Sequence, residues 1–484
     1  MICLEIEHNI RYNDEFLKLI LLDLASGGPQ MSLTVNFGFA LSKKLAGHGI
    51  ANEMLKPALD RTAKALEGIR GERAAGKLPY LDLPEDAKAK VACKEMAEQF
   101  VGYENFLLSG IGGSALGPLA IFNALGHPLH NLLSNAKRKG APRFFALDNV
   151  DPVLADALLS YCKPDKTVYN IISKSGSTAE TAAATLLIFQ LLQKKLGADW
   201  KKNVVCTTDP TSGDLRKLCT DEKLRTLPLH SGVGGRFSVL TPVGLFPSYC
   251  LGFDVDAMLA GAAEMRERCL DSDVHRNPAA QMAALLYLFD STQHKKMHVM
   301  MAYANGLYGM ADWFRQIWAE SLGKELDNEG RVVNNGPTPL KALGTTDQHS
   351  QVQLYIEGPH DKVFLFLECK KFGKRLKLPE MYNNVSSLNY LGGQTMNKLL
   401  AAEFTATREA LAQRGRPSMT ITFPEIDAHA VGEFFMLWEM VTSISGSLYR
   451  INPYDQPGVE LGKQLTYGLM GRAGFEDKAK GIKV

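Results

Sequence analysis

Short apolar runs alternate with amphipathic segments along most of this chain. In its first half each apolar run leads into a turn, and after the turn the apolar positions recur at helical spacing. This alternation predicts a parallel sheet with helices on both faces. The expected strands are 105–109, 143–147, 167–172, 203–207 and 224–229, and a long helix is expected at 178–196.

The same alternation continues in the second half, without a sequence repeat or a low-complexity linker between the halves. Its expected strands are 297–303, 363–369 and 419–423, and its expected helices are 307–322, 347–357, 396–414 and 428–449. The predicted fold class is therefore α/β, with two doubly wound parallel-sheet domains and a helical C-terminal tail.

The predicted boundaries follow the changes in pattern. They give a leader at 1–30, a helical segment at 31–100, a first α/β domain at 101–275, a second at 276–445 and a tail at 446–484. The leader lacks the regular pattern and ends in Ser26-Gly-Gly-Pro29, so we expect Met31 to be the natural start. Mass spectrometry of the native N-terminus tests this expectation.

The composition narrows the classes of function. A chain of 484 residues exceeds one compact core, and 54 basic against 52 acidic residues leave a net charge of +2. We therefore expect no nucleic-acid or membrane partner, and an anionic ligand would need a local site. The eight cysteines are scattered without a C-x-x-C pair, and no run reaches the ~20 apolar residues of a membrane span. A cytoplasmic location is expected.

Two turns that each follow a strand and open a helix are candidate phosphate sites. Ser109–Gly117 is rich in glycine, so its backbone N–H groups can approach a phosphate, although a tight turn without ligand fits equally well. In Ser173–Thr181, Ser177 and Glu180 fit a helix-capping box. The hydroxyls of this second turn, beside Lys174, exceed what a cap needs and favour a phosphate monoester.

Four further segments carry candidate chemistry that is ambiguous in isolation. Arg236 stands among glycines in Gly232–Gly244, and Glu320 lies at the end of an amphipathic helix. His349 ends a polar turn, and Lys463 lies close to the C-terminus. Each of them alone would usually be a solvated or structural side chain.

Taken in order, these segments resemble the phosphoglucose isomerase family from about residue 31 to about residue 470. The specific stretches are Gly234–Gly244 and Gly446-Ser-Leu-Tyr through Tyr454–Glu460 to Lys463. The turn with Ser173-Lys-Ser-Gly is similar to sugar isomerase (SIS) domains in general. The resemblance implies a homodimeric isomerase of glucose 6-phosphate and fructose 6-phosphate, active in glycolysis and gluconeogenesis through an enediolate and without a cofactor.

The resemblance also implies roles for individual residues. Glu320 would move the proton, His349 and Lys463 would assist ring opening, and Arg236 would stabilise the enediolate. His349 would act in the partner's site. The phosphate would be held by Gly113, Ser114, Ser173, Lys174, Ser175 and Thr178, and the sugar hydroxyls by Gln316 and Gln456.

This chemistry agrees with the residue types. One carboxylate can carry a proton between neighbouring carbons, and a fixed cation stabilises the enediolate. A histidine can protonate the ring oxygen near neutral pH, and no step requires a metal or a nicotinamide. Asp347, where many relatives carry a neutral residue, could raise the proton affinity of His349.

Three alternatives stay open at this point. The chain could be another SIS-domain isomerase, acting on mannose or glucosamine phosphates, or a dual glucose and mannose phosphate isomerase, since glucose and mannose phosphates differ only in the orientation of one hydroxyl. A non-catalytic sugar-phosphate sensor would be expected to lack Glu320, His349 or Lys463, and all three are present. A nicotinamide enzyme has little support, because Asp148 lies too far along the chain from the glycine turn.

Overall fold

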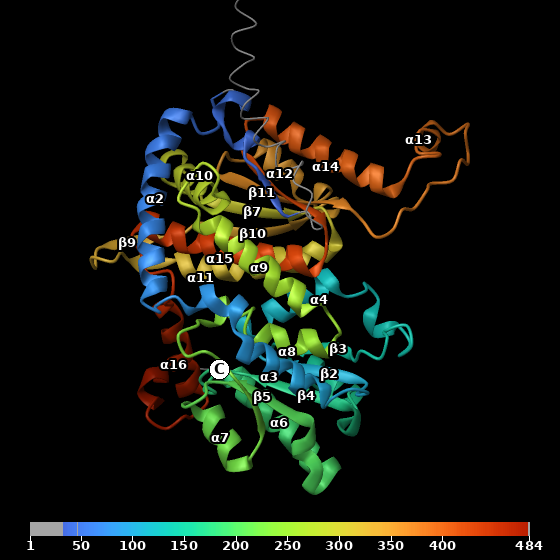
Figure 1. Cartoon of the computed structure of the whole chain (residues 1–484), viewed down its shortest axis with the longest axis vertical. Coiled ribbons are helices and arrows are strands. Elements are labelled where there is room, and N and C mark those ends of the chain that lie inside the picture. Colours follow the sequence, from blue (N-terminus) through green and yellow to red (C-terminus); the bar gives the residue numbers. More distant parts are fainter. Residues whose placement is uncertain (1–31, 46, 483–484) are drawn as a thin grey trace, which may run out of the picture.

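The computed structural model describes residues 32–45 and 47–482, in which two five-stranded sheets lie one above the other along the long axis (Figure 1). The expected leader at 1–30 lies outside the described residues. The boundaries of the domains stay a prediction. The two sheets themselves confirm the predicted α/β class with parallel strands.

The first sheet is entirely parallel, in the order β3-β2-β4-β5-β6. Its central strands are buried along their whole length, as expected where helices cover both faces. Its strands are β2 (Asn105–Ser109), β3 (Arg143–Leu147), β4 (Thr167–Ile172), β5 (Val204–Thr208) and β6 (Arg225–Pro228).

Alternate side chains of this sheet enter different cores. Phe106 and Leu108 join the large central core, whereas Leu107 joins a separate cluster on the opposite face. This period of two is the geometry of a strand between two helical layers. The helices of this half are α3 (Ala87–Glu98), α4 (Leu116–Leu125), α5 (Pro152–Tyr161), α6 (Ala179–Leu196), α7 (Asp214–Glu222) and α8 (Pro242–Cys250).

The second sheet has the order β1-β12-β11-β7-β10, with β1 as its antiparallel edge. The sequence pattern did not predict β1 or β10, because β1 is very short and β10 carries a proline and a lysine. The strands are β1 (Thr34–Asn36), β7 (Met297–Ala302), β10 (Thr338–Leu343), β11 (Lys362–Lys371) and β12 (Ser418–Glu425).

Helices also cover both faces of this sheet. One face packs on α12 (Val352–Glu357) and α14 (Met396–Gln413) through residues such as Tyr355 and Phe404. The predicted helix at 347–357 is shorter than expected, because a 3₁₀ turn at Thr346–Gln348 precedes α12. The opposite face contacts the central core with α10 (Pro278–Gln293) and α11 (Tyr308–Leu322).

Helix α15 (Ala428–Tyr449) lies between the two sheets (Figure 1). It is buried on nearly all sides, because α9 (Val255–Leu270), α10, α11 and α2 (Asn52–Ala74) pack around it. A helix with apolar side chains on every face is stable only in such a position, although α15 also buries a few polar groups such as Glu439. One continuous core, from Phe106 in the first sheet to Leu365 in the second, therefore joins the two halves.

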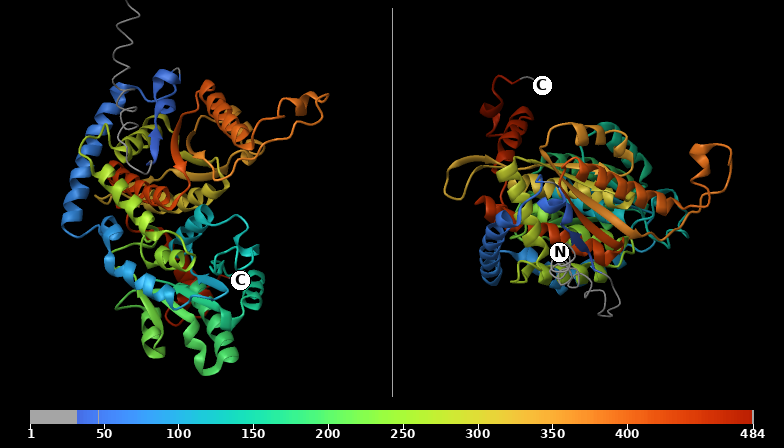
Figure 2. Two further views of the ribbon diagram at one scale, coloured as in Figure 1. Left: turned by 45° about the vertical axis from the view of Figure 1, so that its right-hand side comes forward. Right: turned by 90° about the horizontal axis from the view of Figure 1, so that it is seen from above.

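Three segments project from this body (Figure 2). They are the hairpin of β8 (Lys324–Leu326) and β9 (Val332–Asn335), the arm 373–395 with α13 (Ser386–Asn389), and the C-terminal α16 (Glu460–Leu469), in which no residue is buried. Within the described part of the chain, no helix combines the length and apolarity needed to cross a membrane.

Candidate active site

The two predicted phosphate turns lie side by side. β2 and β4 are adjacent parallel strands, so the turns that follow them leave the same edge of the sheet. Gly113 and Ser114 belong to a 3₁₀ turn after β2. Ser173, Lys174, Ser175 and Thr178 follow β4 and lead into α6.

The capping box that Ser177 and Glu180 offered as the alternative to phosphate binding does not form. Thr178 is the N-cap of α6, and no side chain caps the helix. The Ser173 hydroxyl accepts a hydrogen bond from the Gly176 N–H at 3.0 Å, and the hydroxyls of Ser175 and Ser177 lie 2.9 Å apart. The first-turn N–H groups of α6 therefore stay available to an anion.

Lys174 ties this turn to the segment that carries Arg236. Its Nζ donates to the carbonyl oxygens of Ser231 and, at 3.0 Å, Val233. Burial lowers the pKa of Lys174, and the negative charge of Asp209 partly offsets this shift. Ser114, Lys174 and Gly235 line a small cavity between the turns.

Gly113 brings the first turn against the same segment. A Cβ at Gly113 would lie 2.2 Å from the Gly235 carbonyl carbon and 2.7 Å from the Arg236 nitrogen. Any side chain would thus separate the two backbones. The close packing places the candidate phosphate site directly beside Arg236.

Arg236 lies at the centre of the site and is only 2% exposed. Its Nε donates to the Ser321 hydroxyl at 2.7 Å, and its Nη2 donates to the carbonyl oxygens of Pro453 and Asp455 at 2.6 and 2.9 Å. Its Nη1 donates to Gln456 Oε1 at 2.8 Å and to Glu320 Oε2 at 3.3 Å. This fixed guanidinium is thereby aimed at the Glu320 carboxylate.

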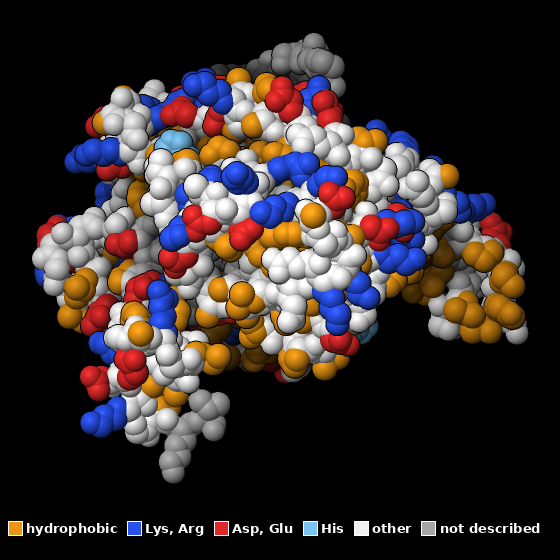
Figure 3. All heavy atoms as spheres, turned by 90° about the horizontal axis from the view of Figure 1, so that it is seen from below, with side chains coloured by type: hydrophobic (Ala, Val, Ile, Leu, Met, Phe, Trp, Pro, Cys, Tyr) orange, Lys and Arg blue, Asp and Glu red, His pale blue; other side chains and the backbone are white. Residues whose placement is uncertain are grey.

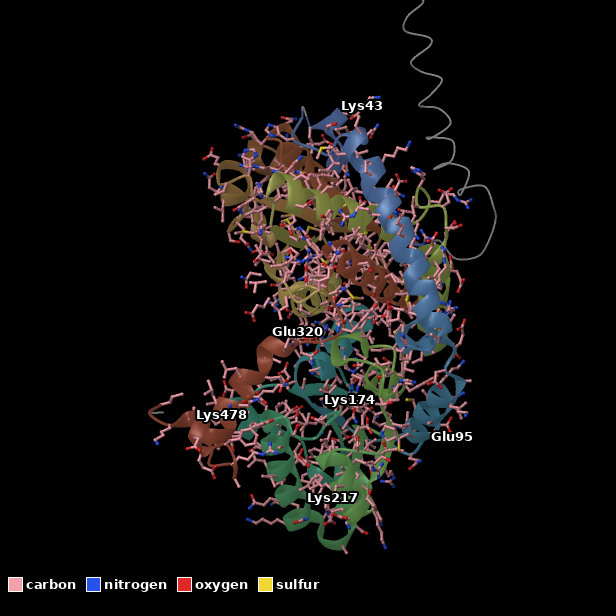
Figure 4. All side chains as sticks on the ribbon, turned by 90° about the vertical axis from the view of Figure 1, so that its left-hand side faces the viewer. Lys43, Glu95, Lys174, Lys217, Glu320 and Lys478 are labelled. Carbon is pink, nitrogen blue, oxygen red and sulfur yellow. The ribbon has the colours of Figure 1, made fainter. Side chains whose placement is uncertain are left out.

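Glu320 lies in the last turn of α11, with its side chain one third exposed. A second buried cation stands behind it, because Lys324 Nζ donates to the Glu320 carbonyl at 2.7 Å and to the Asp455 carbonyl at 2.9 Å. Burial lowers the pKa of Arg236, and burial together with the charge of Arg236 lowers that of Lys324. Figure 4 shows Glu320 beside the C-terminal helices and near Lys174.

The two predicted glutamines flank this pair. Gln456 contacts Arg236 directly. Gln316 lies one turn before Glu320 on α11, and its amide nitrogen would be 3.0 Å from a Cβ at Gly112. Its Oε1 is buried without a hydrogen-bond partner among the described residues. Gln316 therefore reaches from the helix of Glu320 to the first glycine turn.

Lys463 and His349 stand apart from this cluster in the described structure. Lys463 Nζ pairs with Glu460 at 2.7 Å on the exposed helix α16. That helix contacts the site through Tyr467, whose hydroxyl donates to the Ser177 carbonyl at 2.8 Å. His349 is exposed, and no hydrogen bond or ion pair in the described chain joins it to Glu320.

The carboxylate of Asp347 is held within its own turn. It accepts hydrogen bonds from the Leu343 N–H and the Ser350 hydroxyl, both at 2.7 Å. Burial raises the pKa of Asp347 and these hydrogen bonds lower it, with a net shift downward. An effect of Asp347 on His349 stays a prediction.

Sequence reasoning missed three members of the cluster, namely Ser321, Lys324 and Asp455. The segment Glu320-Ser-Leu-Gly-Lys324 contains two of them, and the spacing of four between Glu320 and Lys324 was the available signal. Asp455 could not be found this way, because its contact with Lys324 joins positions 131 residues apart.

The assembled groups can anchor an anion, move a proton and stabilise negative charge within one site. The serine-rich turns supply hydroxyl and backbone donors, Glu320 supplies a carboxylate and Arg236 a fixed cation. Among the residues described, no three His, Cys, Asp or Glu side chains gather as metal ligands do.

Comparisons with known proteins agree with this geometry. A family model described as phosphoglucose isomerase matches residues 95–477. A glucose-6-phosphate isomerase from Carboxydothermus hydrogenoformans is 41% identical over 457 residues, which cover 93% of this chain and 97% of that protein. One from Rubrobacter xylanophilus is 43% identical over 399 residues, covering 82% of this chain and 90% of that protein.

Solved structures give the same picture. A hypothetical protein from Thermus thermophilus superposes with a TM-score of 0.79 at 37% identity, covering 91% of this chain and all of that one. A glucose-6-phosphate isomerase from Chlamydia trachomatis superposes with a TM-score of 0.69 at 24% identity, covering 79% of this chain and 73% of that one. The second likeness supports the fold.

Proposed function

The chain belongs to the phosphoglucose isomerase family, and on that premise we propose how its site interconverts glucose 6-phosphate and fructose 6-phosphate. The chain is an aldose–ketose isomerase. The observation that carries the assignment of its residues is the Glu320 carboxylate 3.3 Å from the buried Arg236 guanidinium, beside two phosphate-type turns. We place the reaction in glycolysis and gluconeogenesis.

The phosphate serves as the handle that positions the sugar. The hydroxyls of Ser114, Ser173, Ser175 and Thr178, with the N–H groups of Gly113 and of the first turn of α6, hold its oxygens. Lys174 donates to two backbone carbonyls in the described structure. Its charge lies close enough to favour an anion in the cavity that it lines.

Glu320 acts as the base of the isomerisation. Its carboxylate takes the proton from C2 of the open-chain aldose, the electron pair forms the C1–C2 double bond, and the carbonyl oxygen at C1 becomes anionic. The C1 oxygen then takes up a proton while the C2 hydroxyl gives one up, and the same carboxylic acid returns the first proton to C1 as the C2 oxygen becomes the ketone. Holding both carbons at one carboxylate removes the need for a second base.

Arg236 stabilises the enediolate. The guanidinium is held by four protein oxygens besides Glu320, so it needs little rearrangement when negative charge develops on the sugar. Gln316 and Gln456 contact the sugar hydroxyls.

His349 and Lys463 open the sugar ring. A histidine side chain can donate a proton to the ring oxygen near neutral pH while a second group accepts the hydroxyl proton. Lys463 lies on α16, and a hydrogen bond from Tyr467 joins this helix to the phosphate turn. Phosphate binding at the turn can therefore bring Lys463 towards the sugar. The proton transfer between the carbons and those of ring opening are thus assigned to side chains, and the proposal includes no cofactor.

We further propose that the protein is a homodimer in which His349 enters the partner's site. Two observations support it: the exposed position of His349 and the apolar surface of the arm 373–395. Figure 3 shows apolar side chains gathered on the projecting arm. Those of the arm that are exposed are Leu376, Met381, Tyr382, Val385, Leu388 and Tyr390. An apolar projection of this kind marks a protein interface.

A cytoplasmic location is also proposed. All seven cysteines in the described residues are free, including Cys206 and Cys219, which lie near each other. Free thiols persist in a reducing compartment. We expect small-molecule sugar phosphates, rather than nucleic acid or membrane, as its ligands.

A coupled assay for glucose 6-phosphate formed from fructose 6-phosphate tests the assignment. Glu320→Gln is expected to lower kcat by on the order of 10²–10⁴ with little change in substrate affinity, since an amide cannot accept the proton. Glu325→Gln is the matched control, because Glu325 is exposed nearby on β8. Near-normal turnover of Glu320→Gln would remove Glu320 from its role.

A further inference from the structure

Three basic residues precede three neighbouring strands of the second sheet. Lys295 comes before β7, His360 before β11 and Arg416 before β12, and the sheet order places these strands side by side. They therefore share the amino-terminal edge of the sheet. Lys295 Nζ donates to the His360 carbonyl at 2.8 Å, which fixes two of them together.

A cleft of about 680 Å³ opens at this edge. Arg416 and His360 line it together with His48 and with the ends of α12 and α14. Its size lies in the range of small-molecule sites. Figure 1 shows the blue segments of residues 38–45 and 47–50 beside the end of α14 that is remote from α13.

Arg416 carries donors that nothing in the described chain satisfies. Its side chain is buried, with 3% exposure, and its Nη2 donates to the carbonyl oxygens of Ile356 and Gly358 at the end of α12. Its Nε and Nη1 are buried and have no hydrogen-bond partner among the described residues. The hydrogen bonds that cap the end of α12 use one nitrogen of the guanidinium, and within the described part of the chain the N–H groups of the other two nitrogens remain free to donate.

The side chains around the cleft carry more positive than negative charge, which also favours an anionic ligand. Lys295 is buried beside Arg416, and Lys44 and Arg414 add exposed positive charge to the walls. Two acids lie nearby, but Asp361 pairs with Lys362 at 2.5 Å, and Glu357 is exposed and accepts from the Gln353 amide. Lys295 and Arg416 are thus two buried cations whose partly buried neighbouring acid, Asp361, already pairs with a third cation, and such an excess of buried positive charge is costly.

The pKa shifts agree with this geometry. Burial lowers the pKa of Lys295, and the charge of Arg416 lowers it further, whereas Asp361 raises it. Burial also lowers the pKa of Arg416. Both groups would be stabilised in their charged form by an anion in the cleft.

We propose that this cleft binds the phosphoryl group of a small molecule at a second site, separate from the active site. A phosphoryl group carries two charges and several acceptor oxygens, and the free N–H groups of Arg416 and the imidazoles of His48 and His360 can donate to it. The two imidazole rings lie 5.4 Å apart at its mouth.

The backbone at Gly415 lets the chain that follows α14 pack closely against His48 at the mouth of the cleft. Gly415 has a φ of +66°, and a Cβ there would lie 2.5 Å from His48 Cδ2, so only glycine lets the chain pack against that ring. The cleft is also remote from catalysis. Figure 4 shows Lys43, next to the lining residue Lys44, at one end of the molecule and Glu320 in its central part.

Equilibrium dialysis with radiolabelled inorganic phosphate tests the proposal on the full-length protein. Wild type is expected to bind two phosphates per chain, one in each site. Arg416→Met is expected to bind one, with kcat and KM for fructose 6-phosphate unchanged. Arg276→Met is the control, because Arg276 is exposed and pairs with Asp271 and Asp273 away from the cleft; it should still bind two.

A second variant covers the case in which Arg416→Met does not fold after losing its contact with α12. His48→Ala/His360→Ala leaves the Arg416 cap in place and is expected to weaken phosphate binding at the second site about tenfold or more. One phosphate per wild-type chain, or no weakening in this double variant, would overturn the proposal. Equal binding of acetate would overturn its assignment to a phosphoryl group.

Discussion

Arg236 combines burial with five hydrogen-bond acceptors. Four of them, from Ser321, Pro453, Asp455 and Gln456, fix its plane, and the fifth is the Glu320 carboxylate. Three elements distant in sequence therefore meet at one guanidinium. Its orientation at this point is set before substrate arrives, which is the condition for electrostatic stabilisation of a transition state.

Replacing Arg236 by lysine tests this orientation. Lys keeps the charge but cannot make the planar set of contacts, so kcat is expected to fall by on the order of 10²–10³. Steady-state kinetics on fructose 6-phosphate measures the fall, and a thermal melt of the same sample checks the fold. An unchanged kcat in a folded variant would show that charge alone, without geometry, is sufficient.

Among single residues, the sequence predicts those site residues that belong to a short local motif. Glycine turns after buried strands point to Ser114 and Ser175, because the apolar runs and the glycines lie within a few positions of each other. Lys324 and Asp455 escape such reasoning. Their importance comes from a contact between α11 and the segment before α16, which only the folded chain brings together.

Among the elements, α16 has no buried residue, and one hydrogen bond, from the Tyr467 hydroxyl, ties it to the phosphate turn. Tyr467→Phe removes that bond and leaves the ring. The KM for fructose 6-phosphate is expected to rise about two- to tenfold, the range of one neutral hydrogen bond. Steady-state kinetics provides the comparison, with the melting temperature unchanged because the helix covers no core. An unaltered KM would separate α16 from phosphate binding.

Helix α15 contains a carboxyl group whose burial disfavours its charged form. Glu439 is fully buried, both of its oxygens lack a hydrogen-bond partner among the described residues, and burial raises its pKa well above the ordinary value. Above the ordinary Glu pKa the unfolded chain loses this proton while the native chain keeps it. Native stability therefore falls as the pH rises towards the raised pKa.

Glu439→Gln isolates this effect, since the amide does not titrate. Relative to this variant, wild type is expected to lose up to about 1.4 kcal/mol of unfolding free energy per pH unit above pH 5. Urea unfolding at pH 5 and pH 8 measures the difference. Glu325→Gln serves as the exposed control, and a gap between wild type and Glu439→Gln that is independent of pH would contradict the account.

Elements with their own periodic pattern were predictable, and those defined by neighbours were not. The apolar runs of β2, β3 and β4 predicted those strands with their observed bounds. β10 carries Pro339 and Lys341 and is a strand because it pairs with β7 and packs on α11. The capping box at Ser177 failed for a related reason, because that hydroxyl contacts Ser175 instead.

At the scale of the whole molecule, the separation of His349 from Glu320 bears on the oligomeric state. It follows β10 at the edge of the second sheet, and no contact in the described chain joins it to Glu320, whereas the proposed mechanism needs both at one sugar. The proposed homodimer would resolve this, because a two-fold axis would let each chain complete the other's site. The exposed apolar arm is a surface on which such a dimer can form.

Mixing two inactive variants tests the exchange of His349. When Glu320→Gln and His349→Ala chains are unfolded and refolded together, half of the dimers are hybrids, and each hybrid has one site with both native residues. About a quarter of wild-type activity is expected if His349 acts across the interface. If His349 acts within its own chain, the mixture stays inactive, and that result would contradict the proposal.

Proton transfer by Glu320 is the central claim, and isomerisation in deuterium oxide tests it most directly. Glucose 6-phosphate is converted by the wild-type protein in this solvent, and the mass of the fructose 6-phosphate is measured early in the reaction. A carboxylate base predicts one deuterium at C1 in a fraction of the product, because its proton exchanges with solvent before transfer. Product that forms at full rate without any deuterium would contradict it, since the hydrogen would then have moved directly between the carbons.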